Sequence, residues 1–301
     1  MTNTQRAYLA LAAICIIWGT TYTAIKYAVT DFPPFLLVGL RQTTAGILIL
    51  SWAFFTGKAI WPGRMYVARQ VMTGLATITG GNGFITWGMQ YVSSGVAAII
   101  GSLTPVMVVL LTLLWRGSDR INQRMAVGVI LGFCGLGLIF QHGWADFVQP
   151  AYRWGIASCF ASCFTWSLGT VMAKRWNAPD VSPLLNAGLQ ILSGGLGGFI
   201  LSVLFDKNWQ VHHSTTGWLS LVYLASIGSA VAFSLYMFTL KHLSATVSSL
   251  YTYINPIIAL LLGWALLGES LTIWIALGMG ITIVGVWLVN SGAKIGAKIS
   301  A

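Results

Sequence analysis

Residues 255–289 read NPIIALLLGWALLGESLTIWIALGMGITIVGVWLV and carry a single charged side chain, Glu269. A helix that crosses the hydrocarbon core of a bilayer needs about 20 mostly apolar residues. The stretch therefore predicts two membrane spans, joined by a tight hairpin at residues 268–270. The whole chain has this character, because 56% of its 301 residues are hydrophobic and 7% are charged. A soluble domain has about a quarter of its residues charged, so a soluble fold is excluded.

Apolar windows of this length recur along the whole chain, separated by short polar or glycine- and proline-containing connections. We predict an all-α polytopic membrane protein of ten transmembrane helices. The expected spans are 7–29, 34–56, 65–88, 93–115, 123–141, 153–174, 183–205, 216–240, 244–267 and 271–291.

The basic residues lie mostly in alternate connections. With the N-terminus inside, twelve Lys and Arg fall on the cytoplasmic side and two, Arg153 and Lys207, fall outside. This asymmetry follows the positive-inside rule and places both termini in the cytoplasm. It also accounts for the net charge of +10 without a nucleic-acid partner.

The two halves of the chain align with each other at offsets that increase from 148 to 151. Three matches carry the alignment: Trp18 and Lys26 with Trp166 and Lys174, Gly39 and Arg41 with Gly188 and Gln190, and Thr104-Pro105 with Asn255-Pro256. We predict two repeats, 1–145 (helices 1–5) and 146–301 (helices 6–10). An odd number of helices per repeat inverts the second repeat in the membrane, an architecture that permits alternating access.

These features resemble the drug/metabolite transporter superfamily, in particular its ten-helix EamA type. The residues that carry the resemblance are Trp18-Gly19, Lys26, Pro34, Arg41 and the stretch 256–289 with its Gly278 and Gly285. Within that group the chain is similar to the YddG-type exporters of aromatic and other amino acids. The resemblance implies a transporter of the inner (plasma) membrane that uses no cofactor.

Ionisable groups at bilayer depth are expensive and are functional candidates by default. Only Lys26 and Arg41 qualify. The other Lys and Arg lie on one side of the membrane or the other, and every Asp, Glu and His falls in a connection or near a helix end. Arg41 is predicted either to bind a substrate carboxylate or to serve the scaffold, by capping carbonyls or by snorkelling. Lys26 and Lys174 are expected to snorkel towards the interfaces. Without a buried acid, tight proton coupling is disfavoured.

Uncharged polar side chains at mid-helix must find partners inside the protein, which predicts a central water-filled cavity. The predicted substrate-binding residues are Trp18, Arg41, Thr79, Asn82, Ser102, Ser162, Trp166, Gln190, Tyr251 and Asn255. Pro105 and Pro256 occupy equivalent positions and are predicted to be hinges, with static kinks as the alternative.

Together these patterns predict a secondary exporter of small amphipathic metabolites, amino acids above all, that is facilitative. Efflux of other drugs or metabolites, and a passive channel, remain alternatives. An enzyme is disfavoured, because neither a metal-ligand cluster nor a nucleophile with a nearby base is expected at depth. The expected partners are a small-molecule substrate and the lipid bilayer. The expected oligomeric state is a monomer or a weak homodimer, the latter through Gly128, Gly132 and Gly135.

Overall fold

The computed structural model describes residues 1–58, 60–116, 123–141, 148–206, 209–248 and 250–299, and every regular element within these ranges is a helix. Within the described ranges, six segments are long and apolar enough to cross a membrane, and three shorter apolar helices accompany them. The six are Asn3–Ala28, Pro34–Phe55, Ser94–Trp115, Pro150–Arg175, Pro183–Phe205 and Thr215–His242; the shorter ones are Gln123–Ile139, Tyr251–Leu267 and Ile273–Val289. The protein is therefore a polytopic helical membrane protein.

The helices lie close to the spans expected from the apolar windows. They are α1 (Asn3–Ala28), α2 (Pro34–Phe55), α3 (Arg64–Gly74), η1 (Leu75–Asn82), α4 (Gly83–Gly88), α5 (Ser94–Gly101), α6 (Thr104–Arg116), α7 (Gln123–Gln141), α9 (Pro150–Arg175), α10 (Pro183–Phe205), α11 (Thr215–Tyr223), η2 (Leu224–Val231), α12 (Ala232–His242), α13 (Ala245–Ser248), α14 (Tyr251–Leu267) and α15 (Ile273–Ile299).

Local sequence signals set several of the helix ends. Pro34 and Pro183 open α2 and α10, where the missing N–H costs nothing. Gly268 ends α14 with φ of 67°, a left-handed conformation that glycine adopts without strain. Glu269 then reaches the first turn of α5, where its carboxylate accepts bonds from Ser94 N (2.7 Å) and Ser94 Oγ (2.7 Å). This contact ties the α14–α15 hairpin to the start of α5.

Two π-helical segments interrupt otherwise continuous helices, and the sequence pattern did not predict them. η1 joins α3 to α4, and η2 joins α11 to α12. Each has eight residues, and the two start 149 residues apart, at Leu75 and Leu224. A π-helical turn is wider than an α-helical one and is often found at functional sites. The equivalent positions of η1 and η2 agree with the internal repeat.

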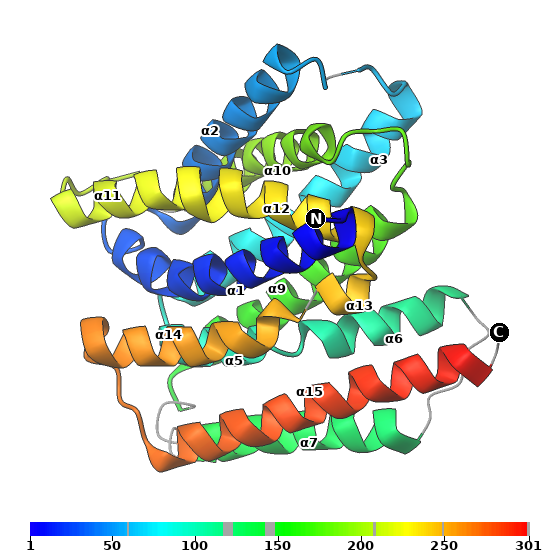
Figure 1. The fold of residues 1–301 in the computed structure, drawn as a ribbon. Helices are drawn as coiled ribbons and strands as arrows, with labels where there is room; N and C mark the ends of the chain where they lie inside the picture. Colours follow the sequence, from blue (N-terminus) through cyan, green and yellow to red (C-terminus); the bar gives the residue numbers. More distant parts are fainter. Residues whose placement is uncertain (59, 117–122, 142–147, 207–208, 249, 300–301) are drawn as a thin grey trace.

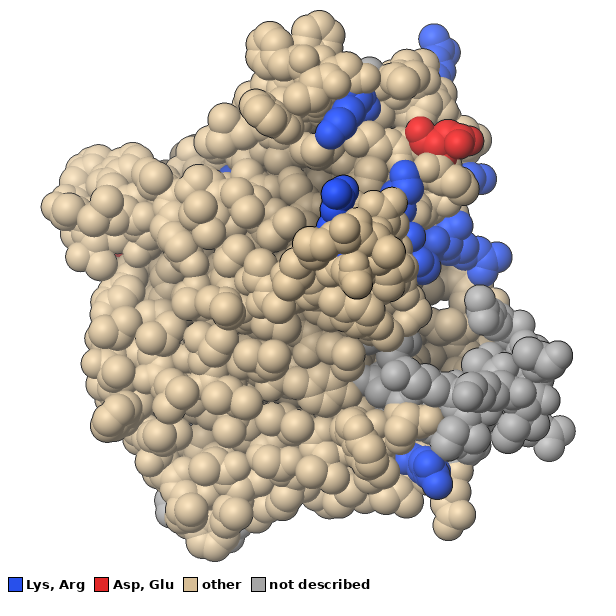
Figure 2. Space-filling model, in the orientation of Figure 1, with Lys and Arg blue, Asp and Glu red and all other residues tan. Residues whose placement is uncertain are grey.

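The helices pack side by side, with α1 near the middle of the bundle between α12 and α14 (Figure 1). α2 runs along α10, and α7 runs along α15 at one edge of the molecule. α1 begins and α15 ends towards the same side of the view. Figure 2 shows most of the visible Lys and Arg gathered on that side, whereas the opposite side is almost free of them.

The α7–α15 contact depends on glycine. A Cβ at Gly135 would lie 2.5 Å from Gly278 O, and one at Gly128 would lie 2.5 Å from Gly285 O. The backbones of the two helices therefore touch, as small residues allow in membranes. The glycine face of α7, which the sequence suggested for a homodimer, is covered by α15 of the same chain. These glycines therefore serve packing within one chain.

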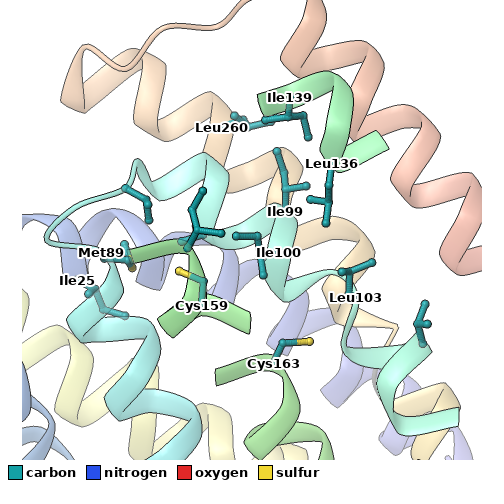
Figure 3. Packing of buried hydrophobic residues seen from close by; sticks show 14 of the residues in the cluster. Ile25, Met89, Ile99, Ile100, Leu103, Leu136, Ile139, Cys159, Cys163 and Leu260 are labelled. Atoms are coloured by element: carbon teal, nitrogen blue, oxygen red, sulfur yellow. The ribbon is translucent and has the colours of Figure 1, made fainter. Parts of the chain in front are cut away.

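Between α7 and the centre of the bundle lies an apolar core (Figure 3). Ile99, Ile100 and Leu103 meet Leu136 and Ile139 of α7 there. Cys159 and Cys163 of α9 belong to the same cluster as buried, free thiols. Both thiols therefore serve packing in this core.

Candidate functional site

A small cavity with polar and apolar lining lies at the centre of the bundle, with a volume of about 90 Å³. A cavity needs at least roughly 10–15 Å³ to hold one water, so the space holds several waters or a small solute. Residues from α1, α2, η1, α4, α5, α6, α9, α10, η2, α12 and α14 contribute to its wall. Both π-helical segments are among these elements.

Seven of the ten predicted binding residues line this cavity: Trp18, Arg41, Asn82, Ser162, Trp166, Tyr251 and Asn255. They come from both halves of the chain. The amide nitrogen of Asn255, oriented to satisfy its neighbours, donates to Cys15 O and Tyr251 O at 3.0 Å each.

The structure places Thr79, Ser102 and Gln190 outside the lining. Thr79 Oγ1 donates to Gly194 O of α10 at 2.8 Å, and Ser102 Oγ donates to Ile99 O of its own turn at 2.6 Å. Gln190 Nε2 donates to Gln70 Oε1 at 2.6 Å in a separate buried contact. The hydroxyls of Thr79 and Ser102 are thus satisfied by backbone carbonyls, an outcome always open to Ser and Thr in membranes, whereas Gln190 Oε1 is buried without a partner.

Among the residues that the structure describes, Arg41 is the only Lys, Arg, Asp or Glu in the cavity wall. Its side chain is 2% exposed and points inward, so it does not snorkel. One guanidinium nitrogen, Nη2, donates to Asn82 Oδ1 at 2.5 Å, and Nε has no partner. No hydrogen bond or ion pair to a carboxylate is found for Arg41 in the described part of the chain. A buried cation with spare donors and no counter-charge is costly, and a bound carboxylate would offset that cost.

Trp18, Trp166 and Tyr251 form an aromatic part of the cavity wall, and Tyr236 packs against their rings without lining the cavity. The ring centroid of Trp18 lies 5.4 Å from that of Trp166, 5.2 Å from that of Tyr236 and 4.6 Å from that of Tyr251. Most of these pairs meet edge to face, a favourable aromatic geometry. Tyr236 was missed from the sequence, because nothing in its neighbourhood separates it from other apolar helix residues. The rings give this part of the cavity a mostly apolar surface.

Four polar atoms on the cavity residues are buried without a protein partner. They are Arg41 Nε, Gln42 Oε1, Trp166 Nε1 and Ser229 Oγ. Buried polar groups are nearly always hydrogen-bonded, so an unsatisfied set around one space indicates that water or a polar ligand occupies it. Gln42 and Ser229 were not among the predicted site residues. The adjacent Arg41 drew attention by its charge, and Gln42 carries no such signal.

The π-helical segments also present carbonyls to side chains of the site. Trp18 Nε1 donates to Gly228 O of η2 at 3.0 Å, and Ser162 Oγ donates to Gly81 O of η1 at 2.6 Å. The wider π turn leaves such carbonyls free for partners outside their own helix. α1 and α9 are thereby each fixed to a π-helical segment beside the cavity.

Lys26 and Lys174 make matching contacts that differ from the predicted snorkelling. Lys26 Nζ donates to Met89 O (2.7 Å) and Val92 O (2.8 Å), at the end of α4. Lys174 Nζ donates to Leu240 O and Leu243 O, both at 2.7 Å, at the end of α12. Helix-terminal carbonyls lack partners within their own helix, and a lysine can satisfy them. Each lysine therefore fastens a helix end inside the bundle.

Replacing Lys174 by Met should lower the free energy of unfolding by about 1–3 kcal/mol, because two carbonyls lose a charged donor. Lys26→Met should have a similar effect, and denaturation in detergent micelles would measure both. The matched control is Lys58→Met, since Lys58 is exposed at the end of α2. Equal stability of all three variants and the unaltered protein would contradict the fastening role.

The two candidate hinge prolines lie in different local surroundings. Pro105 is the second residue of α6, directly after the break between α5 and α6 at residues 102–103. Pro256 lies inside α14, six residues after Leu250, which precedes that helix. A proline at a helix start is unstrained, whereas one inside a helix removes a hydrogen bond. The hinge function itself stays a prediction.

A second, wider cavity of about 1120 Å³ lies where α1 ends and α2 begins. Phe35, Phe84, Trp87 and Trp154 are among its lining residues, together with the carboxylates of Asp31 and Asp206. Asp206 accepts a bond from Leu36 N at 2.9 Å and so caps the start of α2. Asp31 accepts a bond from Ser214 Oγ, at the start of α11. Both carboxylates are thus engaged at helix N-termini.

Comparison with known proteins identifies similar chains. The model of the EamA-like transporter family matches twice, over residues 5–141 and 153–291. YedA of Escherichia coli, described as an uncharacterized inner membrane transporter, is 30% identical over 284 residues, which cover 94% of this chain and 90% of YedA. The uncharacterized transporter YvbV of Bacillus subtilis is 26% identical, covering 96% of this chain and 93% of its own. One solved crystal structure, 19% identical, has a TM-score of 0.71 and covers 98% of this chain and 99% of its own, which shows a shared fold.

Proposed function

Because the chain belongs to the EamA-like transporter family, we propose that it is a secondary transporter that exports small amphipathic metabolites through the central cavity. It is a multi-pass protein of the inner membrane. Amino acids are the favoured substrates in this proposal. The resemblance to YddG-type exporters extends it to aromatic and other neutral amino acids.

The observation that carries the proposal is the buried guanidinium of Arg41, which faces a solute-sized cavity without a counter-charge. A transport site must bind its solute and release it again, so one charged contact surrounded by neutral groups is suitable. Trp18, Trp166 and Tyr251 offer apolar surface to a side chain, while Arg41 offers donors to a carboxylate. A site for organic cations would instead be expected to contain an acid.

We further propose that ten spans form two inverted five-helix repeats with both termini in the cytoplasm, and that the cavity opens alternately to each side. The double match of the family model, the equivalent π-helical segments and the paired lysine contacts support this arrangement. The gathering of Lys and Arg on one side supports the orientation (Figure 2). In that orientation the wider cavity lies at the outer ends of α1 and α2.

Transport is proposed to be facilitative and to involve no catalysis. No Asp, Glu or His lines the central cavity among the residues described, and Asp31, Asp206 and Glu269 are engaged at the first turns of helices. Proton relays in transporters usually run through such groups at depth. A solute that accumulates in the cytoplasm would leave down its own gradient.

The alternatives are a transporter of other drugs or metabolites and a passive channel. Purified protein in liposomes, tested with labelled amino acids of different classes, separates them. A carrier gives flux that saturates with concentration, whereas flux that rises linearly would favour a channel. Accumulation driven by an imposed pH gradient alone would refute the facilitative mechanism.

A further inference from the structure

The hydrogen-bonding groups around the central cavity favour one kind of carboxylic acid over another. We propose that the site prefers small 2-hydroxy monocarboxylates, with Arg41 binding the carboxylate and Gln42 accepting a hydrogen bond from the 2-hydroxyl. The proposal rests on the central cavity being the transport site, and within the small amphipathic metabolites it ranks 2-hydroxy acids ahead of the amino acids favoured above.

The charge of the lining supports an anion over a zwitterion. Arg41 is the one charged group among the described residues of the lining, so a monocarboxylate neutralises the cavity, whereas an amino acid leaves it with a net positive charge. Charges interact strongly in a low-dielectric interior, so an ammonium near Arg41 without a carboxylate to accept it is unfavourable. An amino acid is therefore expected to bind, but more weakly than the matching hydroxy acid.

Gln42 supplies the acceptor for the second substituent. It follows Arg41 on α2, its side chain is 2% exposed, and its Oε1 is buried without a partner. Ser229 Oγ of η2 is also unpartnered, on the same cavity. A neutral hydroxyl can donate to such an oxygen at a small desolvation cost. An unsubstituted acid would leave Gln42 unsatisfied, and that is costly in a buried site.

The volume of the cavity limits the size of the solute. The 90 Å³ space holds several waters, which restricts the solute to a small acid such as 2-hydroxy-3-methylbutanoate. The aromatic wall of Trp18, Trp166 and Tyr251 would contact its alkyl group. Recognition would then consist of one ionic contact, one neutral hydrogen bond and one apolar face.

Three ligands that differ only at the second carbon test the proposal directly: 2-hydroxy-3-methylbutanoate, valine and 3-methylbutanoate. Titration calorimetry with the whole protein in lipid nanodiscs should give the tightest binding for the hydroxy acid. The expected advantage is roughly tenfold over each of the other two. Equal or tighter binding of valine, or equal binding of 3-methylbutanoate, would overturn the preference while leaving the transport site intact. If none of the three binds, both the preference and the carboxylate site fail.

Two substitutions of Gln42 separate its role from a general effect on the site. Gln42→Met keeps the volume and removes the acceptor, so the hydroxy acid should lose its advantage over 3-methylbutanoate. Gln42→Glu adds a negative charge and should make valine the tightest of the three. The matched control is Gln70→Met, because Gln70 is 1% exposed and lies outside the cavity lining. If the ratios of the three affinities stayed the same in both Gln42 variants, the assignment of Gln42 as the acceptor for the 2-hydroxyl would be overturned.

Discussion

Arg41→Gln should weaken the binding of carboxylate-bearing solutes by roughly a hundredfold, because a charge-assisted and potentially two-pronged contact is lost. Counterflow through liposomes should fall accordingly. Gln keeps a polar side chain that can still reach the Asn82 region, so the bundle is expected to fold. The measurement is the dissociation constant of 2-hydroxy-3-methylbutanoate and of its methyl ester, each for the unaltered protein and for the variant.

Two comparisons make this result specific to the carboxylate. The methyl ester of the hydroxy acid is neutral, so its weak binding should hardly change in Arg41→Gln. Arg41→Lys should recover part of the affinity, since it keeps the charge and loses the planar fork. Arg69→Gln is the control, because Arg69 is exposed and lies over the ring of Trp176, 6.0 Å from the ring centroid. An equal loss for acid and ester would assign Arg41 to the scaffold.

Gly135→Val should lower the free energy of unfolding by about 3 kcal/mol or more, because the added side chain meets backbone. The Cβ alone would lie 2.5 Å from Gly278 O and 2.7 Å from Thr282 N. Backbone of a packed helix cannot move aside as a flexible side chain can. α7 and α15 would have to separate along their shared face, and denaturation in micelles would detect the loss.

The same helix offers a matched control for that substitution. Gly137 lies two residues further along α7, and a Cβ there meets nothing within 4 Å. Gly137→Val should therefore leave the stability nearly unchanged. If Gly135→Val and Gly137→Val unfolded alike, the effect would belong to helix propensity and not to the contact with α15.

The sequence was sufficient to locate the helices, because each apolar window carries its own signal. The span expected at 34–56 corresponds to α2 (Pro34–Phe55), and the one at 183–205 corresponds to α10 (Pro183–Phe205). The π-helical segments escaped prediction, since one extra residue per turn barely alters an apolar pattern over eight residues. The hydrogen-bond partners of Lys26 and Lys174 were not predicted either, because a lysine near a helix end can reach the membrane interface or a neighbouring carbonyl equally well.

Residues that are unusual at bilayer depth could be selected from the sequence. Arg41, Asn82, Gln190 and Asn255 stand out for that reason; Arg41, Asn82 and Asn255 line the cavity, whereas Gln190 lies outside its lining and contacts Gln70. Thr79 and Ser102 were chosen on weaker grounds, and their hydroxyls bond to backbone carbonyls instead. Gln42, Ser229 and Tyr236 become candidates only when the helices are assembled, because their relevance lies in missing or aromatic partners contributed by distant segments.

Counterflow tests the central claim, a carrier with a solute site at Arg41, more directly than any other measurement. Liposomes that contain the protein are loaded with an unlabelled amino acid or its hydroxy analogue and diluted into a trace of the labelled compound. The account predicts transient accumulation of label above equilibrium, which the Arg41→Gln protein lacks while Arg69→Gln retains it. Simple equilibration of label without an overshoot, or an overshoot unaffected by Arg41→Gln, would contradict it.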